Sequence, residues 1–344
     1  MAEYLNFHYD PEIFLAFWQN ETDPVRTALL NSGAVVNDAM IADMIRGSGN
    51  FYTIPFYSVL AEDDPQNYDG NTDIVPVETS DKAQSGIVFS RAKAWAARDF
   101  IQDFHRADPL ASITAQVAKW WDKYRQRQMI KLLNGIFSIA DDSSDAWDAW
   151  QLHTTKLAAT GSSVTDANKV GVASAAEAIQ KAVGDNSGIF GAVVMHSAVA
   201  MNLAKLEQLE FRKQTDANGM QRKMNIADWN GLTVVVDDGV PVTASSTASG
   251  EMEYTTYLLG NGAIRRASAP VENPVENHRD AKKNGGQDEI ITRVRETIHP
   301  NGFTFVPPSN MAVSPTDQVL FAAANWKLAA NPKNIAIARL ITNG

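Results

Sequence analysis

The side chains best suited to metal binding or acid–base catalysis are not grouped in this sequence. Six histidines are spread along 344 residues, and none stands two or four positions from another, as zinc ligands within one segment would. There is no cysteine. A zinc site would therefore require ligands brought together from distant segments. The histidines are His8, His105, His153, His196, His278 and His299.

Glycine-rich patterns that bind phosphate or a nucleotide are also missing. The sequence has no GxxxxGK[ST] phosphate loop and no GxSxG nucleophile motif. Gly260-Asn261-Gly262 follows a strand-like run, but Arg265 occupies the position of the third glycine of a dinucleotide fingerprint. We expect a tight turn between two strands there.

Two acidic segments match cation sites only in part. Asn67, Asp69 and Gly70 fit part of a calcium-binding loop, but Pro65 and Pro76 stand at its first and twelfth positions, where carboxylates are required. A second segment holds four aspartates, which are explained more simply as caps of a following helix. We expect no catalytic residue, no metal and no cofactor. An enzyme, such as a hydrolase, would need dispersed catalytic residues. The four aspartates are Asp141, Asp142, Asp145 and Asp148.

The composition is that of an ordinary folded protein with an acidic balance. Hydrophobic residues make up 44% and charged residues 20%, with a formal net charge of -10. This charge argues against a protein that wraps nucleic acid tightly, although not against a surface that merely faces it. The first residues do not form a signal peptide, and no run of eighteen apolar residues occurs. We expect a protein made and used in the cytoplasm.

One long helix is the element around which the others are placed. Asp108 suits the N-cap of a helix over residues 108–137, and Pro109 suits its first position. Apolar residues then recur at helical spacing, which predicts a rod about 40 Å long. On another face, four cations follow one another at every fourth position. Because such like charges repel, we expect an acidic partner opposite them. The cations are Lys119, Lys123, Arg127 and Lys131.

An acidic connection separates two strand-like runs, residues 51–60 and 86–95. Residues 61–82 carry seven carboxylates and a single lysine, Lys82. Loops of this length are uncommon unless they have a function, so we expect an extended acidic hairpin that projects from the body. A solvated, partly disordered loop is the alternative. Its acids include Glu62, Asp63, Asp64, Asp69 and Asp73.

The first eighteen residues contain six aromatic side chains, although chain ends are usually polar. An ordinary N-terminal helix packed on its own core would explain them. An arm anchored on a neighbouring subunit would explain them too, because aromatic residues dominate interface hot spots. The candidate anchors are Tyr4, Phe7, Phe14 and Trp18.

The remaining pattern predicts an α/β unit, then antiparallel strands, then a return to helix and strand. Within residues 151–250 we expect helices over 172–183 and 197–211, strands over 188–194 and 232–236, and a hairpin turn at 216–219. Residues 251–306 alternate as antiparallel strands do. We expect a helix over 315–328 and a strand over 335–341.

The order of these parts resembles the major capsid proteins of tailed double-stranded DNA bacteriophages, which have the Hong Kong 97-type fold. Several segments resemble one group of these proteins, in the right order along nearly the whole chain. They are RTALLNSGAVV (26–36), IPFY (54–57), YDGNTDI (68–74), KNGGQDEIITRVRETIHPNGFTF (283–305) and NWKLAANPKNIAIARL (325–340). Encapsulin nanocompartments share the fold, and an encapsulin-like shell is the alternative.

The resemblance implies an α+β chain with a defined division into parts. Residues 1–47 would be the N-terminal arm and 48–95 the extended E-loop hairpin. Residues 96–150, with a spine helix over 108–137, and the strands of 251–306 would form the peripheral (P) domain. Residues 151–250 and 307–344 would form the axial (A) domain.

The resemblance also implies a structural function without catalysis. Such proteins self-assemble as hexamers and pentamers into an icosahedral virion capsid around packaged DNA, which they contact non-specifically. The implied partners are further copies of the chain, a separate scaffolding protein, a portal protein at one vertex and possible decoration proteins, with no membrane. Some members cross-link through an E-loop lysine, and Lys82 and Lys93 are the lysines of that region.

The distribution of charge predicts partners for the acidic hairpin and for the basic helix face. A hairpin that leaves its own body needs a cationic surface on a neighbouring subunit, for which five cations are candidates. The basic helix face has two interpretations, a weak balance to DNA phosphate in the lumen or an inter-subunit row of ion pairs. The candidate acceptors of the hairpin are Arg279, Lys282, Lys283, Arg293 and Arg295.

Overall fold

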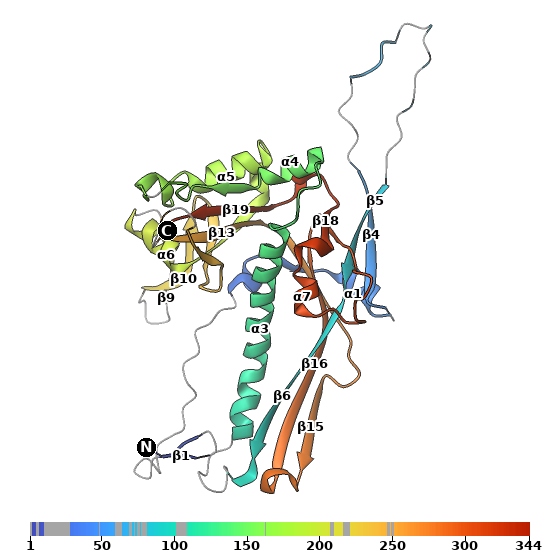
Figure 1. Cartoon of the computed structure of the whole chain (residues 1–344), viewed down its shortest axis with the longest axis vertical. Helices are drawn as coiled ribbons and strands as arrows, with labels where there is room; N and C mark the ends of the chain where they lie inside the picture. Colours follow the sequence, from blue (N-terminus) through green and yellow to red (C-terminus); the bar gives the residue numbers. More distant parts are fainter. Residues whose placement is uncertain are drawn as a thin grey trace.

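The computed structural model describes residues 2–4, 7–9, 28–47, 49–58, 64–68, 71, 73, 76, 81–100, 109–161, 163–206, 210–215, 221–245, 248 and 251–344. These residues form a broad sheet layer with helices, a long leg of one helix beside three strands, and a hairpin that leaves the body (Figure 1). Within the described part, no helix is both long and apolar enough to cross a membrane.

The leg pairs helix α3 (Pro109–Ile136) with a narrow sheet centred on strand β16 (Gln287–Pro300). One side of β16 pairs with β15 (Val275–Asp280) and then with β14 (Ile264–Ala269), which continues to β3 (Val35–Asn37). Its other side pairs with β6 (Phe89–Arg98) over ten residue pairs. The long helix expected over 108–137 is confirmed within the described residues.

Two polar contacts fix the helix on this sheet. The Trp121 indole donates a hydrogen bond to the Thr292 hydroxyl over 3.1 Å, and the Arg125 guanidinium lies 2.8 Å from the Glu296 carboxylate. The Glu296 side chain is 1% exposed and Arg125 is 14% exposed, so the pair is nearly withdrawn from water. Arg266 on β14 stands 3.9 Å from the same carboxylate.

The broad layer is an eight-stranded sheet in the order β7-β19-β13-β8-β11-β10-β9, with β12 paired to β13. This sheet contributes to two apolar clusters. Helix α3 and the C-terminal segment pack in one cluster, and helices α5 (Ser174–Val183) and α6 (Ser197–Lys205) pack in the other. The strands are β7 (Thr154–Lys156), β8 (Phe190–Met195), β9 (Glu210–Thr215), β10 (Gln221–Trp229), β11 (Leu232–Val236), β12 (Val242–Ala244), β13 (Met252–Gly260) and β19 (Ile337–Thr342).

Strand β13 lies in this sheet and not with the strands of the leg, because it pairs with β8 and β19. The expected boundary at residue 251 therefore falls too early. The chain passes to the leg at the turn expected at Gly260-Asn261-Gly262, where Gly262 has φ of 69°. A Cβ on Gly260 would lie 2.3 Å from the Ala336 side chain, so glycine is required at this crossing.

The projecting hairpin is formed by β4 (Phe51–Tyr57) and β5 (Asp81–Ile87), which pair from Phe51↔Ile87 to Tyr57↔Asp81. The strand expected over 86–95 is in fact divided. Strand β5 belongs to the hairpin, whereas β6 begins two residues later and pairs with β16 in the leg. Strands β1 (Ala2–Tyr4) and β2 (Phe7–Tyr9) form a separate antiparallel pair.

Two expected helices are shorter than the sequence pattern indicated. The helix expected over 197–211 ends at Lys205, because residues from Glu210 onward pair with β10. The helix expected over 315–328 is only α7 (Asp317–Leu320), because Trp326 must join β18 (Trp326–Leu328) against β17 (Phe303–Phe305). There the buried Trp326 indole donates to the Leu320 carbonyl over 2.8 Å.

The remaining elements are short. Helix α1 (Ala39–Ile45) packs beneath the hairpin with Tyr52 and Ile54, and α4 (Asp145–Gln151) follows α3. The 3-10 turns are Ala28–Asn31, Asp166–Asn168, Ser187–Ile189, Lys283–Gly285, Ala323–Asn325 and Pro332–Asn334.

Removing the buried carboxylate should cost more stability than removing the carboxylate of an exposed ion pair. We expect Glu296→Ala to lower the free energy of unfolding by about 3–5 kcal/mol, because two arginines then lose their buried partner. The matched control is Asp166→Ala, which breaks the exposed 3.0 Å pair with Lys169 and should cost less than about 1 kcal/mol. Urea unfolding measures both, and equal losses would contradict the assignment.

Candidate assembly surfaces

The root of the projecting hairpin is anchored firmly to the leg. The Tyr52 and Thr297 hydroxyls lie 3.0 Å apart, and the Gln84 side-chain oxygen accepts a hydrogen bond from Gly302 N over 3.0 Å. The other face of β4 is open, because Tyr57 is 80% and Phe51 49% exposed. The hairpin therefore has one face on its own subunit and one face available to another.

Two of the predicted acidic contact residues can be placed. Asp64 and Asp73 are exposed, and neither forms an ion pair with another described residue. Glu62, Asp63 and Asp69 lie outside the described residues. The predicted contact of these acids with a neighbouring subunit stays a prediction.

The predicted N-terminal anchors can be placed only in part. Tyr4 and Phe7 are Cα partners in the register of the β1–β2 pair. Phe14 and Trp18 lie outside the described residues.

Four of the five predicted acceptor cations already have partners within their own chain. Arg279 reaches Asp99 at 2.6 Å and Asp288 at 2.9 Å, and Lys283 reaches Glu289 at 2.9 Å. In addition, Arg293 pairs with Glu276 at 2.8 Å, and Arg295 donates to the Gly49 carbonyl over 2.5 Å. Lys282 is the one member of the five whose side chain has no ion pair or hydrogen bond with a described residue. These cations therefore lie together on the leg, as predicted, but most of them already bind groups of their own chain.

The cations of the predicted basic face of α3 have fewer partners within the chain than the five predicted acceptor cations. Lys119, Arg127 and Lys131 are exposed, and none forms an ion pair with a described residue. Arg127 lies over the Tyr124 ring at 5.7 Å. Lys123 is half-buried and is engaged within the chain. For Lys119, Arg127 and Lys131, the expected acidic partner is not found among the described residues of the same chain.

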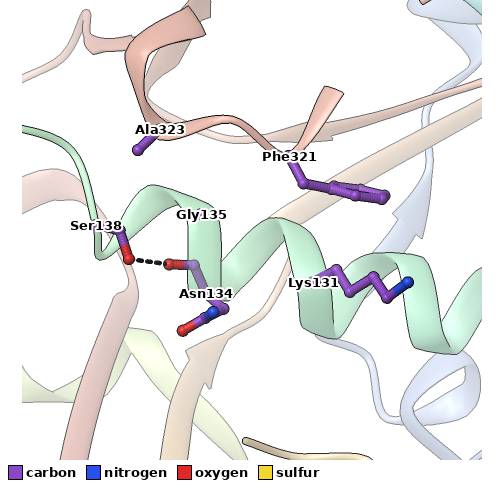
Figure 2. Close-up of a pocket in the computed structure, with 6 residues that line it drawn as sticks. All are labelled: Lys131, Asn134, Gly135, Ser138, Phe321 and Ala323. Carbon is purple, nitrogen blue, oxygen red and sulfur yellow. Dashed lines mark hydrogen bonds between the residues drawn. The ribbon is translucent and has the colours of Figure 1, made fainter. Parts of the chain in front are cut away.

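A pocket of about 240 Å³ lies at the C-terminal end of this basic face (Figure 2). Lys131, Asn134 and Ser138 line it from α3, and Phe321 and Ala323 line it from the segment after α7. Gly135 keeps the two segments close, because a Cβ there would lie 2.5 Å from the Phe321 carbonyl oxygen.

The described residues contain no group of three or more histidine, aspartate or glutamate side chains able to hold a metal ion. The expectation that the aspartates cap the following helix is wrong, because none of the four is its N-cap. Ser144 is the N-cap of α4 and accepts from Trp147 N, while the Asp142 carboxylate accepts from the Ser144 hydroxyl over 2.6 Å. That bond is the largest cause that lowers the pKa of Asp142.

His299 is the most unusual titratable group of the described residues. It is fully buried beneath the hairpin root, between the Tyr52 and Trp326 rings, and neither ring nitrogen has a hydrogen-bond partner. Burial, with a smaller contribution from Arg265, lowers the pKa of His299 to about 3. The imidazole is therefore neutral at ordinary pH.

A polar cluster that has no signal in the local sequence joins three distant segments. Asp317 accepts from Arg91 at 2.6 Å and from Gln128 at 3.2 Å, and Tyr124 lies beside it. This cluster connects β6, α3 and α7. Arg91 and Asp317 are 226 residues apart, so no local pattern could have paired them.

Comparison with known proteins gives a consistent result. No protein-family model matches the chain. A protein named "Major capsid protein", of Bacillus phage SPP1, is 28% identical over 338 residues, which cover 95% of this chain and 94% of that protein. The capsid of Ralstonia phage GP4 matches the fold with a TM-score of 0.61 at 10% identity, covering 100% of this chain and 98% of that chain. The cyanophage Pam1 capsid gives 0.58 at 10% identity, covering 99% of both chains.

The fold that these structures share with the chain, a long helix beside a narrow sheet and a broad sheet layer, is the Hong Kong 97-like capsid fold, and its class is α+β. The chain is in addition similar, along nearly its whole length, to a curated major capsid protein of a phage. These similarities support a structural coat protein of a phage shell.

The buried histidine leads to a prediction on acid stability. The unfolded chain takes up this proton near pH 6.5 and the folded chain only near pH 3, so acidification between these values favours unfolding. We expect His299→Phe to make the fall in unfolding free energy over this window shallower by up to about 1.4 kcal/mol per pH unit. Urea unfolding at several pH values measures the slope. The exposed His278→Phe is the control, and an equal change in both variants would refute the assignment.

Proposed function

We propose that this coat protein assembles as hexamers and pentamers into an icosahedral shell that encloses packaged double-stranded DNA. The observation that carries the proposal is the match to a major capsid protein along 95% of the chain, combined with the capsid fold. The net charge of -10 fits such a shell, because a wall with few free cations lets DNA move in and out without adhesion.

The parts of the chain take the roles that the capsid fold assigns. Residues 1–47 act as the N-terminal arm, β4 and β5 with their connection as the E-loop, and α3 with β6, β14, β15 and β16 as the P domain. The eight-stranded sheet, which includes β13, acts as the A domain at the axes of the capsomers. Strand pairing supports this division. Strand β6 pairs with β16 and is assigned to the P domain, although most of it lies before the boundary expected at residue 95. Strand β13 pairs with β8 and is assigned to the A domain, although it lies after the boundary expected at residue 251.

The proposed partners extend beyond copies of the chain itself. A separate scaffolding protein directs assembly in the host cytoplasm, a portal protein replaces one vertex, and decoration proteins are a further class of partner. Packaged DNA is contacted without sequence preference. The spacing of cations on α3 offers no base-reading pattern, which supports only weak, non-specific contact.

The acidic connection of the E-loop contacts a neighbouring subunit. Its described acids, Asp64 and Asp73, are exposed and have no ion pair in the described part of their own chain. The open face of β4, with Phe51 and Tyr57, supplies apolar area beside them. Charge in this contact sets the register and the rate of association more than the final affinity.

Assembly itself is tested by negative-stain electron microscopy of the purified full chain, with size-exclusion chromatography and light scattering, alone and with the phage's own scaffolding protein. We expect closed shells, tubes, or stable pentamers and hexamers, because the binding energy is spread over large interfaces between copies. A chain that stayed monomeric under both conditions would refute the proposal.

Charge reversal tests the E-loop contact separately. We expect Asp63→Lys with Asp64→Lys to lower the yield of shells at low salt and to flatten its dependence on salt, because attraction at this contact becomes repulsion. Sedimentation of shells over a series of salt concentrations measures both quantities. The control is Asp166→Lys, which reverses the charge of an exposed acid far along the chain. An unchanged yield and salt dependence in the loop variant would contradict the proposed contact.

A further inference from the structure

Two cations of the broad sheet layer lack an acidic partner. Arg339 on β19 and Lys181 on α5 form no ion pair with a described residue. Both donate to Thr154 on β7. The Arg339 Nη2 lies 3.4 Å from its hydroxyl oxygen, and the Lys181 Nζ lies 3.2 Å from its carbonyl oxygen. Two positive charges therefore meet at one residue without a counter-charge among the described residues.

Arg339 is the more costly of the two cations to leave without a counter-charge, because most of its side chain is out of water. Its guanidinium lies over the Phe137 ring at 4.7 Å, and burial lowers the pKa of this group. The Arg339 Nε and the hydroxyl of the cross-strand neighbour Tyr257 are both buried, and neither has a hydrogen-bond partner among the described residues. A desolvated charge destabilises the fold unless an opposite charge or several hydrogen bonds accompany it.

The two cations meet at a free edge of the sheet. Strand β7 is the last strand of the layer and pairs on one side only, with β19. His153 and Leu157 direct backbone groups toward β19, so Thr154 directs its own N–H and C=O away from that strand. The Thr154 carbonyl oxygen receives Lys181, whereas its N–H donates to no described residue. Thr154 therefore offers a backbone donor and a hydroxyl beside the two cations.

A carboxylate close to this edge is already engaged. Lys156, two residues beyond Thr154 on β7, lies 2.9 Å from the Glu253 carboxylate. The same carboxylate accepts a hydrogen bond from the Ser245 hydroxyl over 3.3 Å. Glu253 thus balances Lys156, and the charge beside Thr154 stays positive within the described part of the chain.

We propose that the free edge of β7 is an oxyanion-binding site, in which Arg339 and Lys181 hold a phosphate or carboxylate group and Thr154 donates to it. The ligand class follows from the donors, because guanidinium and ammonium groups bind the oxygens of such anions through charge-assisted hydrogen bonds. The oxyanion has two sources, a free anion in solution or an exposed carboxylate of another copy. The inference goes beyond the proposed function, since binding of a free anion requires no assembly.

Thermal unfolding of the unassembled full chain at a series of inorganic phosphate concentrations tests binding from solution. We expect phosphate to raise the melting temperature more than chloride does at equal ionic strength, because a ligand of the folded chain stabilises it. Arg339→Met keeps an aliphatic stem over Phe137 but removes the charge, and it should weaken the apparent phosphate affinity at least tenfold. Lys181→Met, at an exposed position, should weaken it by a smaller factor. The matched control is Lys327→Met, at an exposed position of β18, which should leave the affinity unchanged.

Stability without added phosphate separates an anion site from an arginine that only packs. We expect Arg339→Met to raise the melting temperature in phosphate-free buffer of low ionic strength, because it removes a desolvated charge that has no partner. This advantage should disappear as phosphate is added to both proteins. An arginine that acted only through Phe137 and Thr154 would instead give a variant that melts lower by the same amount at every phosphate concentration.

Shell yield, measured by sedimentation in phosphate-free buffer, distinguishes the two sources. A phosphate response that Arg339→Met abolishes assigns the site to a free anion. No phosphate response, together with a yield that Arg339→Met lowers at least tenfold and Arg339→Lys partly restores, assigns it to a carboxylate of another copy.

The absence of a phosphate response, with a shell yield that Arg339→Met leaves unchanged, overturns the inference. Should Arg339→Met fail to fold, Lys181→Met gives the same comparisons, because its side chain is exposed. Failure of the wild-type chain to form shells under any condition would refute the proposed function. The phosphate titration alone then decides whether the oxyanion site exists.

Discussion

The ion pair between Arg125 and Glu296 is the contact on which the leg of this protein depends. It joins the middle of α3 to β16 at a point where both side chains are almost out of water. Burying a single charge is costly, so the pair holds its geometry only when both partners are present. Because β16 is paired on both sides, with β6, β15 and β14, a helix fixed to β16 is fixed relative to all of them. Trp121, one turn away, adds a hydrogen bond to Thr292 and an apolar surface.

This rigid leg explains how a subunit can extend a long hairpin without losing its own stability. The hairpin root is bonded to β16 through Tyr52 and Thr297 and to the β16–β17 turn through Gln84 and Gly302. Beneath it, Ile41, Ile45 and Ile54 form a separate small apolar cluster with Tyr52. The contacts that hold the hairpin are thus concentrated at its base. Beyond the base, Tyr57 and the described acids Asp64 and Asp73 are exposed.

Sequence alone predicted the elements whose signals are local. The long helix has an N-terminal Asp-Pro and 3.6-residue periodicity over seven turns, and no tertiary contact was needed to see it. The helix expected over 315–328 failed because tertiary packing overrode the local pattern, placing Trp326 in a strand. Strand β13 was assigned to the wrong sheet, since antiparallel periodicity does not reveal which strand is the partner.

The cations predicted to contact the hairpin show a similar limit of what the sequence reveals about charge. A sequence reveals how many cations a segment carries, but not which of them the fold has already neutralised. Arg279 is held by Asp99, 180 residues earlier, and by Asp288 across the strand pair, whereas Lys119 and Lys131 meet no described carboxylate. The two kinds of cation look alike in the sequence, and only the fold distinguishes them.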